Sequence, residues 1–143
     1  MKLNKKLIEE YCYHGEGFKP FLIQDNWQIA KLNYKFGNSF ENINEIEVHH
    51  KTDEVFILLK GTAVLIGVEK GGGKLSFYLV KMNKGIVYNI PKGVWHSIAM
   101  NEDAEVLIVE DANTHLGDYE LHEMSDEQKE TLKSDLALCI FDK

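Results

Sequence analysis

Two short segments of the chain carry side chains of the types that bind transition metals. The first contains His49 and His50, followed by Glu54, and the second ends at His96. Neutral imidazole and carboxylate ligands suit iron, manganese, nickel, zinc and cobalt, and two histidines with one carboxylate leave coordination positions open for a substrate or dioxygen. If these side chains converge, the sequence predicts a site for one divalent transition metal.

The adjacent histidines cannot both face the same side of a regular strand, because successive side chains alternate between its two faces. An inward His49 brings Glu47 inward with it. That arrangement offers four candidate ligands: Glu47, His49, Glu54 and His96. An inward His50 leaves three: His50, Glu54 and His96. The apolar Ile46 and Val48 favour an inward His50 if the interior is uniformly apolar.

The segment before His96 has the residues of a tight turn between two strands. Gly85, Pro91, Gly93 and His96 are separated by five, one and two residues. Proline fixes the backbone for a turn, glycine tolerates a positive φ, and the histidine follows on the next strand. This spacing resembles the second sequence motif of the cupin superfamily, although Met100 stands where that family often has asparagine.

The first segment is also similar to a cupin motif, with one departure. Glu54 and Gly61 are seven positions apart, as in the family, and the residues between them are apolar. The histidines are adjacent, whereas cupins usually have one residue between them. The resemblance implies a small β-barrel that holds one divalent metal. Because metal-binding cupins prefer four ligands, it favours an inward His49.

The elements around both motifs are short strands separated by turns. Apolar and alternating runs predict strands over residues 21–23, 27–34, 45–50, 54–59, 62–68, 75–81, 86–90, 94–99 and 105–110. We therefore expect an all-β fold, an antiparallel β-barrel or jelly roll of the cupin kind. Several strands are apolar at consecutive positions, which predicts cover on both faces, by the barrel interior on one and by a helix or a second subunit on the other. A homodimer is the expected assembly.

Short helices are predicted at both ends of this barrel. Residues 3–12 have apolar positions near helical spacing, and Ser125 with Gln128 forms a capping-box pattern that begins a helix at Asp126. We expect one domain over residues 1–143, with a barrel core over about 18–112 and a helical tail over about 125–139. The polar residues between barrel and tail predict a loop that packs across the barrel.

Composition limits the partners. The 143 residues are 44% hydrophobic and carry a formal net charge of −7, so we expect neither nucleic acid nor an anionic membrane as a partner. No apolar run approaches the ~20 residues of a membrane span. Cys12 and Cys139 fit no metal spacing and indicate free thiols. With no apolar signal segment near the start, a cytoplasmic location is expected.

Three functions are compatible with these observations. The first is a metal-dependent enzyme acting on a small polar metabolite, with iron, manganese, nickel or zinc as the metal. The second is a metal-free isomerase or epimerase acting on a sugar nucleotide, in which a pocket histidine transfers protons. The third is a ligand-binding or sensor protein without enzymatic activity. The residue pattern identifies no catalytic group and no substrate.

Overall fold

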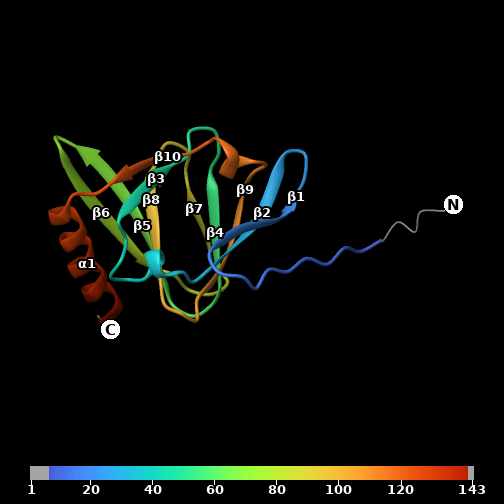
Figure 1. Ribbon diagram of the computed structural model, residues 1–143, viewed down its shortest axis with the longest axis horizontal. Coiled ribbons are helices and arrows are strands. Elements are labelled where there is room, and N and C mark those ends of the chain that lie inside the picture. Colours follow the sequence, from blue (N-terminus) through green and yellow to red (C-terminus); the bar gives the residue numbers. More distant parts are fainter. Residues whose placement is uncertain (1–6, 142–143) are drawn as a thin grey trace.

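A computed structural model of the protein, shown in Figure 1, describes residues 7–141. Ten strands, one α-helix and two short 3₁₀ turns make up this part of the chain. They are β1 (Phe18–Ile23), β2 (Trp27–Asn33), η1 (Phe36–Asn38), β3 (Glu45–Val48), β4 (Glu54–Lys60), β5 (Ala63–Gly71), β6 (Lys74–Lys81), β7 (Val87–Ile90), β8 (Trp95–Met100), β9 (Glu105–Asp111), η2 (Thr114–Leu116), β10 (Glu120–Glu123) and α1 (Asp126–Phe141).

The strands form two antiparallel sheets that lie side by side in Figure 1. One sheet has the order β1-β2-β9-β4-β7 and the other the order β10-β3-β8-β5-β6. In the described part of the chain, no strand of one sheet pairs with a strand of the other. The expected mostly-β cupin-like architecture is therefore present, but the two sheets do not close into a continuous barrel.

The main core fills the space between the sheets. Period-two burial along β4 and β9 points Phe56, Leu58, Val106 and Ile108 inward, where they pack with one another.

The turn after β4 lies close to the start of β9. Gly61 has a φ of +79°, and a Cβ at this position would lie 2.5 Å from the Ala104 Cα, so only glycine fits without a backbone shift.

A second apolar cluster lies on the other side of the β10-β3-β8-β5-β6 sheet, beneath α1. Leu132 and Leu136 of the helix pack there with Val64 and Ile66 of β5. This cover explains why β5 is buried at four consecutive positions. The helix begins as predicted, because Ser125 and Gln128 exchange side-chain-to-backbone hydrogen bonds of 2.9 and 3.2 Å.

The predicted N-terminal helix is wrong over the residues that the structure describes. Residues 7–12 are not helical and extend away from the sheets in Figure 1, while residues 3–6 of the prediction lie outside the described residues. Leu7 is 97% exposed and Ile8 is 81% exposed, so no surface buries the apolar stripe that would stabilise so short a helix. Within residues 7–141, no helix has the length and apolar character that crossing a bilayer requires.

Candidate metal centre

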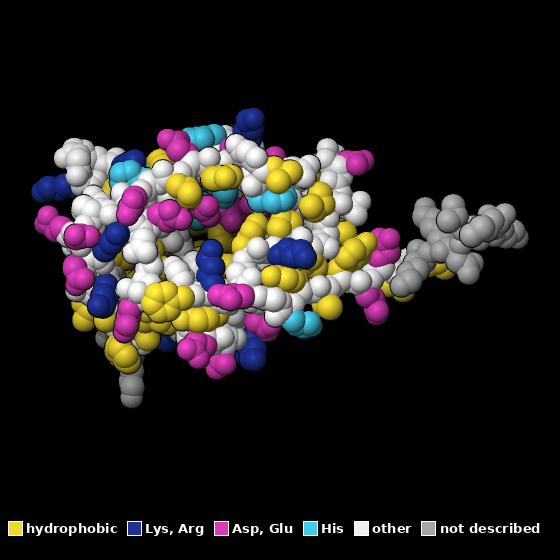
Figure 2. Space-filling model, viewed as in Figure 1, with side chains coloured by type: hydrophobic (Ala, Val, Ile, Leu, Met, Phe, Trp, Pro, Cys, Tyr) yellow, Lys and Arg dark blue, Asp and Glu magenta, His cyan; other side chains and the backbone are white. Residues whose placement is uncertain are grey.

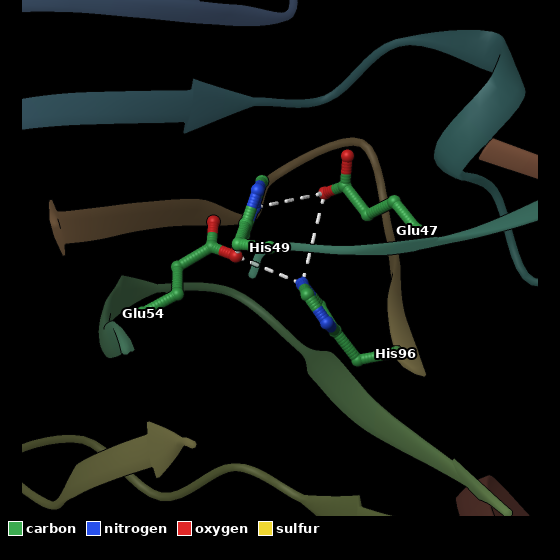
Figure 3. Close-up of side chains that lie close together, drawn as sticks. All are labelled: Glu47, His49, Glu54 and His96. Atoms are coloured by element: carbon green, nitrogen blue, oxygen red, sulfur yellow. Dashed lines mark hydrogen bonds and ion pairs between the residues drawn. The ribbon is translucent and has the colours of Figure 1, made fainter. Parts of the chain in front are cut away.

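Four side chains from both sheets converge between them, as Figure 3 shows. Glu47 lies on β3, His49 just after it, Glu54 at the start of β4 and His96 on β8. Each offers one ligand atom, and these atoms lie within 4.8 Å of one another. Glu47 pairs directly with His96 across β3 and β8, whereas Glu54 comes from the opposite sheet.

His49, and not His50, faces the interior. His49 is 6% exposed, whereas the His50 side chain is 56% exposed and its Nε2 lies 2.8 Å from Glu120 Oε2. The arrangement with an inward His50 is therefore contradicted. The apolar character of Ile46 favoured an inward His50 only if the apolar face of β3 pointed to the interior. Ile46 instead packs into the cluster beneath α1, on the covered outer face of the sheet. The interior face of β3 is thus free to carry Glu47.

The donor atoms have separations suited to one shared ion. Nε2 of His49 and Nε2 of His96 lie 2.9 and 2.8 Å from the same oxygen, Glu54 Oε2. Glu47 Oε1 lies 3.7 Å from His96 Nε2 and 4.0 Å from His49 Nε2. Ligands about 2.1 Å from a metal would be about 3 to 4 Å apart. The buried His49 Nε2 makes no well-directed hydrogen bond despite its nearness to Glu54, which also fits a ligand atom.

The outward nitrogens of both histidines bind backbone carbonyls. His49 Nδ1 lies 2.6 Å from the Asp118 carbonyl oxygen, and His96 Nδ1 lies 3.0 Å from that of Val94. A carbonyl only accepts, so each Nδ1 must carry the proton and each Nε2 can present a lone pair to the interior. The Asp118 carboxylate in turn accepts 2.9 Å hydrogen bonds from the backbone N–H groups of His50 and Lys51.

A cavity of about 670 Å³ opens beside these four side chains and is visible as a hollow in Figure 2. Its walls are partly apolar, with Leu32, Phe56 and Ile108 among them. Five carboxylates line it: Glu45, Glu47, Glu54, Glu110 and Glu123. Among residues 7–141, Lys35 is the one lysine that lines it, and the chain contains no arginine. The cavity is therefore rich in negative charge and poor in fixed positive charge.

Comparison with known proteins shows which sequences the chain is similar to. No protein-family model matches the chain. Acireductone dioxygenase of Bacillus subtilis is 27% identical over 91 residues, which are 64% of this chain and 49% of the relative. The chain thus spans about half the length of this curated relative.

Two solved structures share the architecture. A cupin-2 domain protein of Shewanella frigidimarina has a TM-score of 0.50 at 22% identity, over 69% of this chain and 84% of its own. The chain has a cupin-like fold. Streptomyces Pac13, solved with uridine, has a TM-score of 0.56 at 10% identity, over 90% of this chain and 98% of its own. In the present chain, Glu47 stands two positions before His49, where the cupin motif usually has its first histidine.

Burial and charge oppose each other in the four-residue cluster of Glu47, His49, Glu54 and His96. Burial disfavours the ionised form of Glu54, but the imidazoles of His49 and His96, 2.9 and 2.8 Å from its Oε2, outweigh this and lower the pKa of Glu54. Burial would lower the pKa of His49, but Glu54 outweighs it and raises the pKa to about 9. The pKa of His96 is raised through the same balance. A metal entering this site would therefore displace protons.

Glu110 and Gln28 belong to the site but were missed by the sequence analysis. The Glu110 side chain is 2% exposed, and its Oε1 accepts a 2.9 Å hydrogen bond from Gln28 Nε2. Burial, followed by the charge of Glu54, raises the pKa of Glu110 to about 7. A signal was present, because period-two alternation from Val106 through Ile108 places Glu110 on the inward face of β9.

Proposed function

We propose that this cupin binds one divalent transition metal through Glu47, His49, Glu54 and His96. The observation that carries this proposal is the convergence of four donor atoms, with both imidazoles fixed through Nδ1, beside a cavity. Two histidines and two carboxylates suit iron, manganese, nickel or zinc.

We further propose that the chain is a metal-dependent enzyme acting on a small polar metabolite. When bound, such an ion would supply Lewis acidity or a site for dioxygen at the cavity. The protein would hold the ligands with carbonyl hydrogen bonds and limit water through its apolar walls. Similarity to an acireductone dioxygenase supports a role in small-molecule chemistry.

The sugar-nucleotide alternative has less support from the cavity. A diphosphate needs cationic partners, and arginine supplies the best geometry for phosphate. The chain has no arginine, and the lining of the cavity contains five carboxylates besides Lys35. This balance of charge opposes a diphosphate ligand, so we retain the metal-dependent function.

Elemental analysis of protein purified without added metal or chelator tests the proposal. We expect about one transition metal per chain, as a single cluster of this type implies. His49→Ala and His96→Ala should each reduce metal content strongly while preserving the β-sheet circular dichroism spectrum. His50→Ala is the matched control and should retain the wild-type metal content, because His50 faces solvent.

A protein that carries no metal and takes up none of the four candidates would contradict the metal site. Equal losses in His49→Ala and His50→Ala would contradict the ligand assignment. Stoichiometric metal with ligand binding but no turnover of any bound metabolite would instead support the non-enzymatic alternative.

A further inference from the structure

The segment between β9 and β10 lines the cavity with a histidine that the proposed metal centre does not use. His115 lies on η2, is partly exposed and is one of the lining residues. The centroid of its ring lies 6.4 Å from that of Phe18, which lines the same cavity. His115 is therefore placed to contact a molecule in the cavity.

Gln28 determines which nitrogen of His115 carries the proton. Gln28 Oε1 accepts a 2.8 Å hydrogen bond from the Asn113 backbone N–H, so Gln28 Nε2 is the atom that faces Glu110 and His115. An amide nitrogen only donates, and this one lies 3.2 Å from His115 Nδ1. Nδ1 must therefore accept, which places the ring proton on Nε2.

The His115 ring is anchored on its Nδ1 side and open at Nε2. Gln28 is fully buried, and the neighbouring Thr114 is buried with its Oγ1 donating a 2.7 Å hydrogen bond to the Asp111 carbonyl oxygen. Within residues 7–141, His115 Nε2 has no hydrogen-bond partner, and it is not one of the four side-chain atoms that are both unpaired and buried. Nε2 is thus an accessible N–H donor.

This donor lies close to the four-residue cluster. Gln28 Nε2 also lies 2.9 Å from Glu110 Oε1, and Glu110 Oε2 lies 4.0 Å from His49 Nε2. Two side chains, those of Gln28 and Glu110, thus separate His115 from His49. A molecule with a few carbon atoms is long enough to reach from the cluster to His115.

Charge does not by itself decide between a neutral and a singly charged ligand. A divalent ion would offset the carboxylates that bind it, and the raised pKa values of Glu110 and His49 mean that protons offset further negative charge. The proton position on His115 is a sharper criterion. An N–H group pairs with an acceptor, so an ammonium group at this position would leave Nε2 unpaired.

We propose that His115 is a specificity-determining residue, whose Nε2–H donates to a carbonyl or carboxylate oxygen of a small ligand bound at its other end to the metal. Gln28 is the positioning residue that holds His115 with Nε2 protonated. The expected ligand class is a hydroxy acid or oxo acid that carries a further carbonyl group. The metal-bound end rests on the proposed function, whereas the donor is present with or without metal.

Chemical-shift titration of ¹⁵N-labelled protein with two monoanionic probes tests this proposal. The probes, 2-hydroxy-4-oxopentanoate and 2-hydroxypentanoate, share a chelating end and differ at one carbon, which is a carbonyl in the first and a methylene in the second. His115→Phe keeps a ring but has no donor. The preference for the oxo probe should be about two- to tenfold larger in wild-type protein than in His115→Phe, as one neutral hydrogen bond implies.

His122→Phe is the matched control. The His122 ring packs edge-on against Trp95 and does not line the cavity, so this variant should keep the wild-type preference. A second measurement applies if His115→Phe fails to fold. In wild-type protein labelled with ¹⁵N-histidine, the oxo probe should shift the His115 Nε2 resonance more than 2-hydroxypentanoate does.

Zinc-loaded and chelator-treated protein are titrated in parallel, so that this inference and the proposed function are judged separately. A protein that takes up no zinc contradicts the proposed function, yet a preference that depends on His115 in the metal-free protein still supports the inference. Equal preferences in wild type and His115→Phe overturn it even if zinc binds. An equal loss in His122→Phe, or no binding of either probe to either form, also overturns it.

Discussion

His49 depends on a residue far along the chain for its orientation. Asp118 supplies the carbonyl that binds His49 Nδ1, and its carboxylate secures the backbone of His50 and Lys51. The segment after β9 is therefore linked by hydrogen bonds to the loop that carries His49. Asp118 acts through His49 and is a positioning residue.

We predict that Asp118→Ala weakens metal binding about tenfold. The variant keeps the backbone carbonyl that binds His49 Nδ1, but it loses the carboxylate that anchors the backbone of His50 and Lys51 next to that ligand. Competition of the protein with a chelator for zinc measures the affinity. The visible spectrum of the cobalt-loaded variant should also change, because the geometry of His49 changes. Glu120→Ala is the control, since the Glu120 carboxylate lies 2.8 Å from Nε2 of the solvent-facing His50 and is not one of the four clustered side chains. Wild-type affinity in Asp118→Ala would contradict the positioning role.

Glu110 should make the metal-free protein less stable as pH rises. Its pKa is about 7 in the folded protein against a usual 4.5, so the folded state binds the proton more tightly. The resulting stability is full below pH 4.5 and is lost as pH rises through 7. The loss should be about 3 kcal/mol. His49 adds a similar loss at higher pH, between 6.5 and about 9.

Glu110→Gln should remove the part of this pH dependence that belongs to Glu110. Urea unfolding at about pH 5 and pH 8, with chelator present, measures the free energy of unfolding. If the unfolding free energy of the variant still falls by the wild-type amount between about pH 5 and pH 8, Glu110 does not hold its proton in the folded state. The same comparison in Glu105→Gln corrects for the loss of a surface carboxylate.

At the scale of elements, α1 decides which face of β3 is apolar. The helix covers the outer face of its sheet with Leu132 and Leu136, and Ile46 of β3 packs against that cluster. With its apolar side chain accommodated outside, β3 can point Glu47 into the cavity. The helix therefore supports the metal centre without contacting it.

Leu136→Ala should lower the free energy of unfolding by about 2–5 kcal/mol, because a fully buried side chain is removed. Leu138 lies two residues away on the same helix but is 70% exposed. Leu138→Ala should therefore change the free energy of unfolding by less than about 0.5 kcal/mol. Urea unfolding compares the two variants. Similar losses in both would mean that α1 contributes through helix propensity and not through packing.

At the scale of the whole molecule, the candidate metal centre lies between two sheets that share no strand pairing. Glu54 belongs to one sheet, and Glu47 and His96 belong to the other. A bound ion would connect them directly. A ligand that binds only the folded state stabilises it in proportion to its occupancy.

Metal should therefore stabilise the protein, by about 2.7 kcal/mol at a free concentration one hundred times the Kd. Thermal unfolding with zinc and with excess chelator measures the difference. His96→Ala should show little difference between the two conditions. An equal response to zinc in His96→Ala would indicate that the stabilising site lies elsewhere.

The homodimer stays a prediction. Val87, Ile57 and Leu107 lie in register across the outer face of the β1-β2-β9-β4-β7 sheet, and Val87 is 63% exposed. We expect a second copy of the chain to cover this row. Sedimentation equilibrium should give twice the chain mass, and Val87→Glu should shift the protein towards monomer. A monomeric wild type would contradict the prediction.

The sequence by itself determined the elements whose signals are local. Alternation and turn residues located nine strands, and the Ser125–Gln128 pair located the start of α1. Strand β10 was not predicted, because its Glu-Leu-His-Glu sequence has no β-branched residue and its strand geometry comes from pairing with β3. The spacing of residues within the two motifs was enough to identify the candidate ligands.

Only the tertiary structure decided between His49 and His50. The apolar Ile46 and Val48 favoured an inward His50, whereas the resemblance to the cupin motif favoured an inward His49. In the fold, α1 covers the opposite face of the sheet, and the interior face is left for Glu47 and His49. Burial of a strand face depends on what packs against it, and here the packing partner lies about 90 residues further along the chain.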